Sequence, residues 1–217
     1  MADAIPVSVK LGLYIFVVSL ILSITAGIIA ALNHNNKWDY SVIGISLIGY
    51  IIPNIVLGPM LIYIFAVYFP ILPGGGWEGG KWQHMILPVA TLALSSLATK
   101  ARMTRGNMLE TLNSNYIRTA RAKGLPKYKI ILRHALRPAL VPLIPTLVFS
   151  LIYIWSGTLI IEKVFGLPGV GHLFVNSALN RDYSLSLSLT MLTAISIIVG
   201  AIIIDILYTV VDPRLRK

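Results

Sequence analysis

Five long apolar stretches separated by polar connections dominate the hydropathy pattern of the chain. None shows the two-residue alternation of a membrane barrel strand, so each predicts a helix. Hydrocarbon about 30 Å thick requires about 20 helical residues, and the stretches reach or approach that length. The expected spans are residues 11–32, 41–69, 85–99, 138–161 and 183–211.

Irregular residues modify two of these spans. The second is longer than needed and contains Pro53 and the pair Gly58-Pro59, which predict a kinked or tilted helix. The third is the shortest. We expect Lys100 and Arg102 at its end to extend it by snorkelling, with their stems along apolar surface and their charges at the headgroups.

Small residues in the first and last spans predict close contacts between helices. Ser19, Ser23 and Gly27 recur at four-residue spacing, and Ser184 and Ser188 repeat that spacing in the last span. Such residues let helix backbones approach one another in a membrane. The first pattern either lines a pathway or packs against another subunit, and the sequence leaves both open.

Composition places the chain among integral membrane proteins. Of 217 residues, 56% are hydrophobic and only 12% are charged, and the mean hydropathy is +0.80; these values lie outside the usual range of soluble domains. The net charge of +10 would suggest nucleic acid in a soluble protein, but here over half of the basic residues form one block. We therefore expect no nucleic-acid partner.

The basic block sets the expected topology. Residues 100–137 hold ten of the eighteen Lys and Arg residues and one acidic residue, Glu110. Short loops rich in Lys and Arg lie in the cytoplasm, so the block and the basic C-terminus are predicted to be inside. The connections 70–84 and 162–182 then fall outside. Five spans place the N-terminus outside as well, and we therefore expect an upstream span to be missing.

The centre of the basic block predicts a short helix outside the membrane. Asn113 or Ser114 suits an N-cap. Gly124 suits a helix terminus, and Pro126 prevents continuation. The expected helix therefore runs from about Ser114 to Gly124.

One face of this helix carries small side chains. Ile117, Ala120 and Gly124 recur at three- and four-residue spacing, with Arg118 and Arg121 around them. Two interpretations remain open. The face receives another protein at close range, or the helix lies against anionic lipid through its positive charge.

Two glycine-rich runs invite a nucleotide-binding interpretation and do not support it. Residues 75–82 approach the phosphate-loop pattern, but Trp82 replaces the hydroxyl residue that holds magnesium, and a proline-rich turn replaces the preceding strand. An outer turn with Trp77 and Trp82 at the membrane interface explains this run better. Residues 166–171 also lack the dinucleotide pattern, and they predict a tight turn before a short helix from His172 to Leu179.

Clusters that would support catalysis or metal binding are missing from the sequence pattern. The chain has no cysteine, which excludes disulfides and thiol chemistry. None of the four histidines has a second ligand at helical spacing, so no metal site is expected. Asp205 is the one acidic residue within a span, and structural pairing with a neighbouring helix is its expected role.

Several runs together resemble one family. They are residues 115–126, residues 161–171, residues 178–184 and residues 205–214, with a weaker match at Lys37-Trp38-Asp39-Tyr40. In this order they resemble the membrane-spanning subunits of bacterial ATP-binding-cassette importers, and within them the oligopeptide and dipeptide permease subfamily. The resemblance covers essentially the whole chain.

The central motif departs from the general importer pattern. Ala120 and Gly124 match it, and Leu136 lies where its later leucine is expected. Arg118 stands where the general motif has glutamate, and Thr119 replaces an alanine. These departures resemble the peptide-permease variant, and they put in doubt any contact that depends on the charge of that glutamate.

The resemblance implies an all-α, polytopic membrane helix bundle of the type I ABC importer permease kind, with five spans here and six in the family. It implies one membrane domain over residues 1–217 that lacks the family's first span, and a coupling-helix region at about residues 106–137. It further implies a multi-pass protein of the bacterial inner membrane with a cytoplasmic C-terminus. The expected function is to pass oligopeptides or dipeptides by alternating access.

The resemblance also implies the partners and the site residues. The partners are a second homologous permease subunit, two ATPase subunits that carry ATP and magnesium, an extracytoplasmic substrate-binding protein, and lipid. This chain is expected to be no enzyme and to bind no cofactor. Its contacts with the ATPase are expected at Tyr116, Ile117, Arg118, Ala120, Arg121, Gly124 and Leu125. The outer mouth is expected to include Gly166, Pro168, Gly169, Gly171, Asn180 and Asp182.

Two alternatives remain. A permease for nickel or another metal chelate belongs to the same subfamily, and the uncharged spans do not distinguish it from a peptide permease. An integral membrane enzyme would require clustered His, Asp or Glu side chains within the spans, and Asp205 alone does not provide them.

Overall fold

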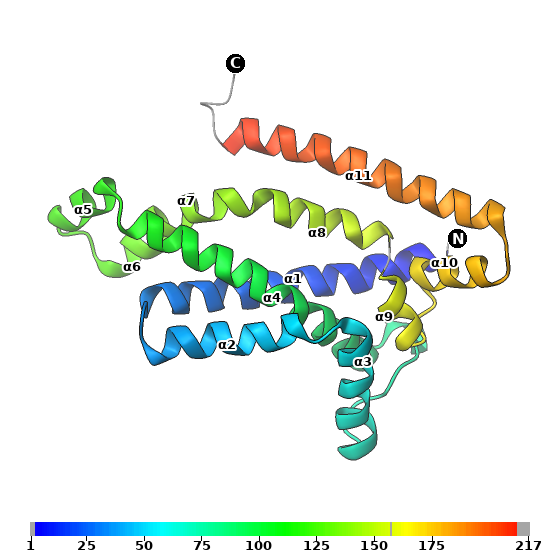
Figure 1. Ribbon diagram of the computed structural model, residues 1–217. Helices are drawn as coiled ribbons and strands as arrows, with labels where there is room; N and C mark the ends of the chain where they lie inside the picture. The colour runs from blue at the N-terminus through cyan, green and yellow to red at the C-terminus, as the bar shows by residue number, and fades with distance from the viewer. Residues whose placement is uncertain (1–2, 157, 212–217) are drawn as a thin grey trace.

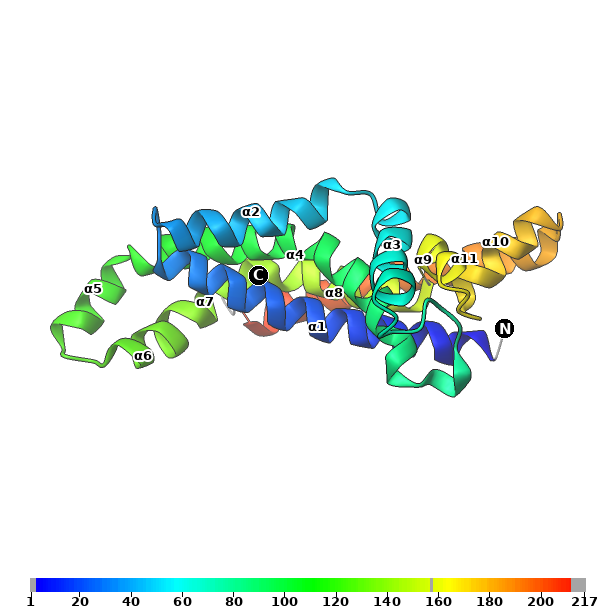
Figure 2. The same ribbon diagram turned by 90° about the horizontal axis from the view of Figure 1, so that it is seen from below.

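The protein is described from a computed structural model over residues 3–156 and 158–211, and these residues contain helices and loops but no strand. The long helices run beside one another, short helices lie at both ends of the bundle, and the segment of residues 54–68 projects from its side (Figures 1 and 2). The α-helices are α1 (Ala4–Leu32), α2 (Lys37–Ile51), α3 (Asn54–Ile62), α4 (Trp82–Leu112), α5 (Asn115–Ala122), α6 (Lys127–Lys129), α7 (Leu136–Leu140), α8 (Ile144–Ser156), α9 (Leu159–Val164), α10 (Val170–Leu179) and α11 (Tyr183–Val211). Short π-helices occupy Tyr63–Tyr68 and Ile130–Ala135, and 3₁₀-helices occupy Glu78–Gly80 and Val141–Leu143.

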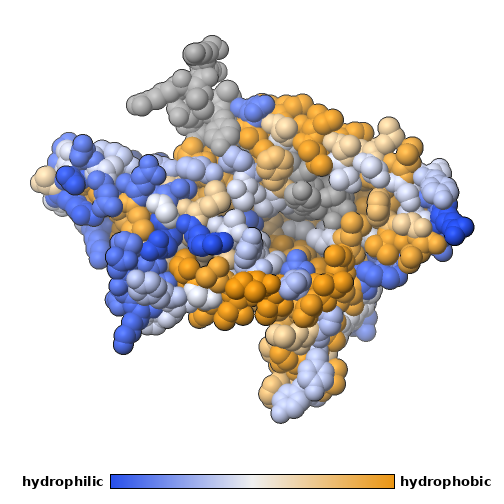
Figure 3. Space-filling model, in the orientation of Figure 1, coloured by the Kyte–Doolittle hydropathy of each residue, from blue (hydrophilic) through white to orange (hydrophobic). Residues whose placement is uncertain are grey.

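The two ends of the bundle carry different segments. The basic residues around α5 and α6 lie at one end, which we call the α5 end. The two connections predicted to be external, residues 70–84 and 162–182, lie together at the opposite end, which we call the α10 end. Figure 3 shows hydrophilic side chains gathered over the α5 end and apolar side chains across the middle of that face. The separation of the two sets of connections agrees with the predicted topology.

Helix α1 packs most extensively against α4. Ser19, Ser23 and Gly27 of α1 are all buried. A Cβ atom added at Gly27 would lie 2.5 Å from the Cβ of Thr104 and 2.8 Å from the carbonyl oxygen of Ala101. Gly27 therefore serves close packing within this chain, a contact that neither of the two alternatives left open by the sequence had named.

The second expected span is not one kinked helix. Helix α2 ends at Ile51, and α3 leaves it at a bend of 100°. Pro53 explains the break, because a proline disfavours helical geometry at the preceding residue, and Ile52 has the extended angles φ −77° and ψ 118°. Of the predicted causes, Pro53 lies at the break, whereas Gly58 and Pro59 lie inside α3. The predicted extent was wrong, because the two helices meet at 100°.

Length and composition mark three helical stretches of the described residues as able to cross a membrane: Ala4–Leu32, Lys127–Leu151 and Tyr183–Ile206. The bent pair formed by Lys37–Ile51 and Asn54–Tyr68 would be a fourth such stretch if it counts as one span. The expected third span lies in α4, which is not among them because only its first half is apolar. The helical stretch that contains most of the expected fourth span starts at Lys127, before residue 138.

Candidate functional site

Helix α5 begins as the sequence predicts, but without a side-chain cap. Ser114 is the N-cap residue and has extended geometry, with φ −69° and ψ 154°. Its hydroxyl donates to the carbonyl oxygen of Thr111 at 2.6 Å, and its oxygen accepts no N–H of the new helix. Ser114 thus ties the start of α5 back to the last turns of α4.

The C-terminus of α5 is a glycine-terminated Schellman motif. Gly124 has φ +72°, and its N–H donates to the carbonyl oxygen of Arg121 at 2.9 Å. The N–H of Leu125 donates to the carbonyl oxygen of Ala120 at 3.3 Å, which completes the motif. Regular helix ends at Ala122, two residues earlier than expected, because Gly124 occupies the left-handed position.

The small face of α5 is turned into the chain. Ile117 is 0% exposed and Ala120 is 7% exposed, and both belong to a core with Met108, Ile130 and Ala135. The interpretation that this face receives another protein is therefore wrong for these two residues. Among the other expected contact residues, Tyr116, Arg118, Arg121 and Gly124 are exposed, while Leu125 is half-buried.

A groove lies beside this surface. Its volume is about 620 Å³, and the ends of α1 and α4 line it together with the segment that follows α5. Apolar side chains such as Leu109 and Ile130 form its floor, and Arg121, Lys127 and His34 add nitrogen donors at its rim. The α5 end thus offers a hollow with an apolar base next to exposed cations.

An ion pair braces the connection between α1 and α2. Arg105 of α4 donates to both carboxylate oxygens of Asp39, each at 2.6 Å, and also to Nδ1 of His34 at 2.9 Å. The Asp39 side chain is only 2% exposed, and its carboxylate also accepts the N–H of Asn35 at 3.0 Å. Asp39 lies in the first turn of α2, before the apolar stretch, and the hydrogen bonds from Arg105 lower the pKa of its carboxyl group to about 2.

At the α10 end, a buried carboxylate organises the connection between α9 and α10. Glu162 is 0% exposed. It accepts hydrogen bonds from the hydroxyl of Ser8 at 2.8 Å and from the N–H groups of Thr158 and His172, each at 3.1 Å. The Ser8 oxygen in turn accepts the N–H of Val170 at 2.8 Å. The first helix and the loop before α10 are therefore held by one network.

This network corrects two residues of the expected outer mouth. Gly169 and Gly171 are buried, and an added Cβ would lie 2.3 Å from Oε2 of Glu162 at Gly169 and 2.8 Å from the backbone of Leu159 at Gly171. These two glycines leave room for Glu162 and Leu159 to pack closely, and they do not contribute to the exposed surface of the outer mouth. The other four expected residues are exposed, namely Gly166, Pro168, Asn180 and Asp182.

The short helix expected after this turn is present. It begins at Val170, two residues before the expected His172, and ends at Leu179 as expected. Asp182 follows it and accepts the N–H of Leu185 at 3.0 Å. This bond satisfies a free donor in the first turn of α11.

The glycine-rich run of residues 75–82 packs onto the same end. The N–H of Gly76 donates to the carbonyl oxygen of Phe165 at 2.8 Å, and Nδ1 of His84 lies 2.8 Å from the carbonyl oxygen of Gly75. Lys81, the lysine of the phosphate-loop-like pattern, pairs with Glu78 at 2.9 Å. These contacts explain the run as a folded connection.

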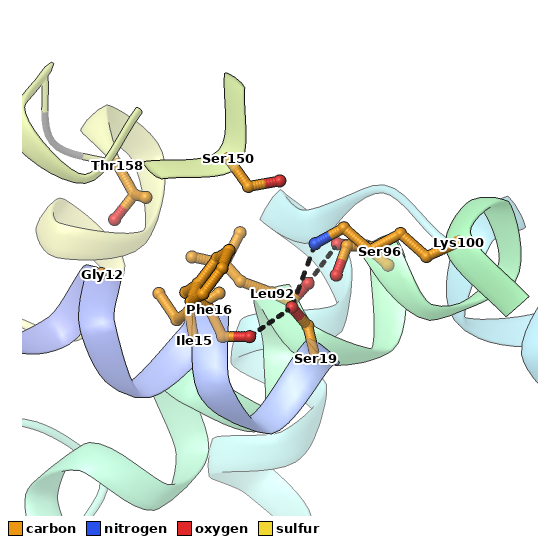
Figure 4. Close-up of a pocket in the computed structure, with 10 residues that line it drawn as sticks. Gly12, Ile15, Phe16, Ser19, Leu92, Ser96, Lys100, Ser150 and Thr158 are labelled. Carbon is orange, nitrogen blue, oxygen red and sulfur yellow. Dashed lines mark hydrogen bonds between the residues drawn. The ribbon is translucent and has the colours of Figure 1, made fainter. Parts of the chain in front are cut away.

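Lys100 does not snorkel. It is 6% exposed, and its Nζ donates to the hydroxyl of Ser19 on α1 at 3.1 Å. The reason is that α4 continues to Leu112, so Lys100 lies within the helix and not at its end. Figure 4 shows its ammonium group directed into a cavity between α1, α4 and α8. Arg102 is exposed, as expected, with its guanidinium 5.6 Å from the ring centre of Tyr50.

Asp205 lies exposed on α11. Among the described side chains, no ion pair or hydrogen bond involves its carboxylate. The expected pairing with a neighbouring helix is thus not found within the part of this chain that the structure describes.

Comparison with known proteins identifies the family. Residues 23–217 match the family described as the binding-protein-dependent transport system inner membrane component. The chain belongs to this family. It is a membrane component of a transport system, with apolar helices that suit the inner membrane.

Individual relatives of this permease cover nearly the whole chain. The oligopeptide transport system permease protein OppB of Escherichia coli strain K12 is 52% identical over 215 residues, which make up 99% of this chain and 70% of that protein. OppB of Haemophilus influenzae is 53% identical with the same coverage. The dipeptide transport system permease protein DppB of Bacillus subtilis strain 168 is 40% identical, over 97% of this chain and 68% of that protein.

Solved structures confirm the fold of an importer permease. An inward-facing structure of the MetNI methionine ABC transporter matches with a TM-score of 0.72 at 17% identity and covers 94% of both chains. An amino acid ABC transporter with histidines also matches with a TM-score of 0.72, at 13% identity, over 95% of this chain and 91% of that chain. The expected type I importer bundle is therefore correct.

Three features of the permease were not found from its sequence. They are the buried Glu162, the pair of Asp39 with Arg105, and Lys100 in its cavity. Asp39 and Glu162 each lie in a run that carries the family resemblance, but nothing local says that they are buried. Lys100 gave one usable signal, since a cation that follows fifteen residues without charge, 85–99, is a candidate functional group in a membrane.

Proposed function

We propose that this chain is the permease subunit of an ATP-driven importer that carries oligopeptides across the inner membrane. The observation that carries the proposal is the 52% identity, over 99% of the chain, to a protein described as an oligopeptide transport system permease. A second homologous permease and two ATPase subunits complete the membrane complex. An extracytoplasmic binding protein delivers the peptide at the α10 end.

The α5 end is the surface that receives the ATPase. Helix α5 is rigidly attached, because Ile117 and Ala120 are buried in the core of this end and the Schellman motif fixes its terminus. An anchored helix transmits a displacement that a flexible loop would absorb. The exposed side chains of Tyr116, Arg118 and Arg121 then make the contact, and ATP and magnesium remain on the partner subunit.

Crosslinking tests this docking surface directly. The chain contains no cysteine, so Tyr116→Cys introduces a single reactive thiol. A short thiol-directed photocrosslinker at this position should capture the ATPase subunit in the assembled complex. Ala120→Cys is the matched control, since Ala120 is 7% exposed and should react slowly. Capture of phospholipid alone at position 116 would contradict the docking role and favour a lipid-facing helix.

Uptake tests the substrate. The complete complex in proteoliposomes, with ATP on the ATPase side and loaded binding protein on the other, should accumulate a labelled tripeptide. A nickel chelate supplied in the same way should not accumulate. The reverse result would show a metal-chelate permease of the same fold.

A further inference from the structure

The cavity around Lys100 lies near the middle of the first span. Ser19, which Lys100 contacts, follows Leu11 by eight residues and precedes Leu32 by thirteen. The cavity has a volume of about 210 Å³. It is lined from three helices, with Ser19 on α1, Ser95 and Ser96 on α4 and Ser150 on α8, and with Thr158 before α9.

The ammonium group of Lys100 has unused hydrogen-bonding capacity. An ammonium group carries three N–H donors, and Ser19 accepts one of them at 3.1 Å. No carboxylate of the described residues lies within ion-pair distance of Lys100. A buried cation without a counter-charge is costly in a membrane interior, so the site favours an anion.

One of the hydroxyl groups around the cavity is free to bind the same ligand. The hydroxyls of Ser95 and Ser150 donate to carbonyl oxygens of their own helices. Thr158 differs, because its Oγ1 is buried and has no hydrogen-bond partner in the described structure. Figure 4 shows Thr158 and Lys100 on opposite sides of the cavity. A cation and a free hydroxyl donor thus line one small space.

We propose that this cavity binds the C-terminal carboxylate of the transported peptide, with Lys100 as its main ligand and Thr158 as a second donor. The proposal rests on the proposed peptide-import function. The C-terminal carboxylate is the one anionic group that peptides of different sequence share. This subsite therefore binds the C-terminal end of the peptide without contacting its side chains specifically. The volume supports an end and not a whole peptide, because pockets for whole small molecules measure roughly 300–1,000 Å³.

The test compares a tripeptide that has a free C-terminus with the same tripeptide as its C-terminal amide. Uptake by the complete complex is measured for wild type, Lys100→Gln and Lys100→Arg. The uptake of each peptide by each variant is divided by the uptake of the same peptide by wild type. Any preference of the binding protein for one of the two peptides then cancels. Lys100→Gln should reduce uptake of the free acid roughly tenfold, the loss of a hydrogen bond to a charged group, and leave the amide unchanged. Lys100→Arg keeps the cation and should retain most of the uptake.

Equilibrium binding of both peptides to the purified complex is the second measurement, and it decides the result if the binding protein does not deliver the amide. Lys100→Gln should weaken binding of the acid only. Thr158→Val should weaken the acid less than Lys100→Gln does. An equal loss for acid and amide in an assembled complex would overturn the proposal and indicate that Lys100 pairs with a carboxylate of a neighbouring subunit. No change for either peptide would also overturn it, whereas a wild-type complex that transports neither peptide would refute the peptide-import function itself.

Discussion

Arg105 and Asp39 form a two-bond ion pair that joins the polar half of α4 to the first turn of α2, with both nitrogen–oxygen distances at 2.6 Å. The pair is asymmetric in exposure, since the Asp39 side chain is 2% exposed and the Arg105 side chain is 25% exposed. Removal of the arginine therefore leaves a buried carboxylate without its cation. The pair fixes where the α1–α2 connection lies relative to the α5 end.

Arg105→Gln should destabilise the protein by about 3–5 kcal/mol, the usual cost of leaving one member of a buried ion pair alone. The double variant Asp39→Asn/Arg105→Gln should be less destabilised than Arg105→Gln, because no buried charge remains. Thermal unfolding midpoints of the wild type and of the single and double variants form the cycle that measures this coupling. Strictly additive effects would show that the two side chains do not interact.

The same pair predicts a pH dependence. The folded-state pKa of Asp39 is about 2 and its ordinary value is 3.8, so the unfolded state binds the proton more readily. The stabilisation is complete above about pH 4 and is lost as the pH falls from there toward 2. The difference in unfolding midpoint between wild type and Asp39→Asn should be constant from pH 5 to pH 8 and shrink below about pH 4. A difference that stayed constant down to pH 2 would contradict the pairing, because Asp39 would then bind protons equally well in the folded and unfolded states.

Local signals in the sequence predicted the elements of this fold well. Gly124 and Pro126 marked the end of α5 because a left-handed glycine and a proline act on the backbone next to them. Pro53 marked the break after α2 for the same reason. The 100° size of that bend depends on what α3 packs against, including Phe165 and Val164 beside Gly58, and this information is not local.

The direction in which side chains point was the part that sequence could not give. Ile117 and Ala120 share a face with correct spacing, but whether this face meets a partner or the chain's own core depends on residues 130–135, which follow it in sequence. Lys100 ends an apolar run and so suggested a membrane boundary. Its inward direction follows from Ser19 on another helix, 81 residues away.

Gly124→Leu should impair coupling through the backbone. An added Cβ atom meets nothing within 4 Å, but φ is +72°, and a left-handed residue other than glycine costs about 1–2 kcal/mol. The Schellman motif should open, and substrate-stimulated ATP hydrolysis by the assembled complex should fall. Gly124→Asn tolerates this geometry better and should retain more activity. Normal stimulation and uptake in Gly124→Leu would defeat the assignment of α5 as the coupling helix.

Gly27→Ala should destabilise the contact between α1 and α4. The new methyl group would lie 2.5 Å from the Cβ of Thr104, and overpacking of this kind costs about 1–3 kcal/mol. Gly106→Ala is the matched control within α4, because nothing lies within 4 Å of its added Cβ, and it should stabilise by about 0.5–1 kcal/mol. The two variants should shift the thermal unfolding midpoint in opposite directions, and a gain for Gly27→Ala would mean that these helices do not pack this closely.

Glu162→Gln should loosen the α10 end although it removes a charge from a buried site. The carboxylate accepts three hydrogen bonds, two at Oε1 from Ser8 and Thr158 and one at Oε2 from His172. An amide supplies one oxygen and an N–H₂ group, so one donor is left facing another donor, at a cost of about 1–3 kcal/mol. Lys163→Gln, an exposed neighbour, should change stability by less than about 0.5 kcal/mol. Thermal unfolding and hydrogen exchange at the N–H of His172 check the result. Faster exchange at that N–H identifies Oε2 as the lost acceptor. Unchanged exchange would show that the carboxylate does not hold this loop.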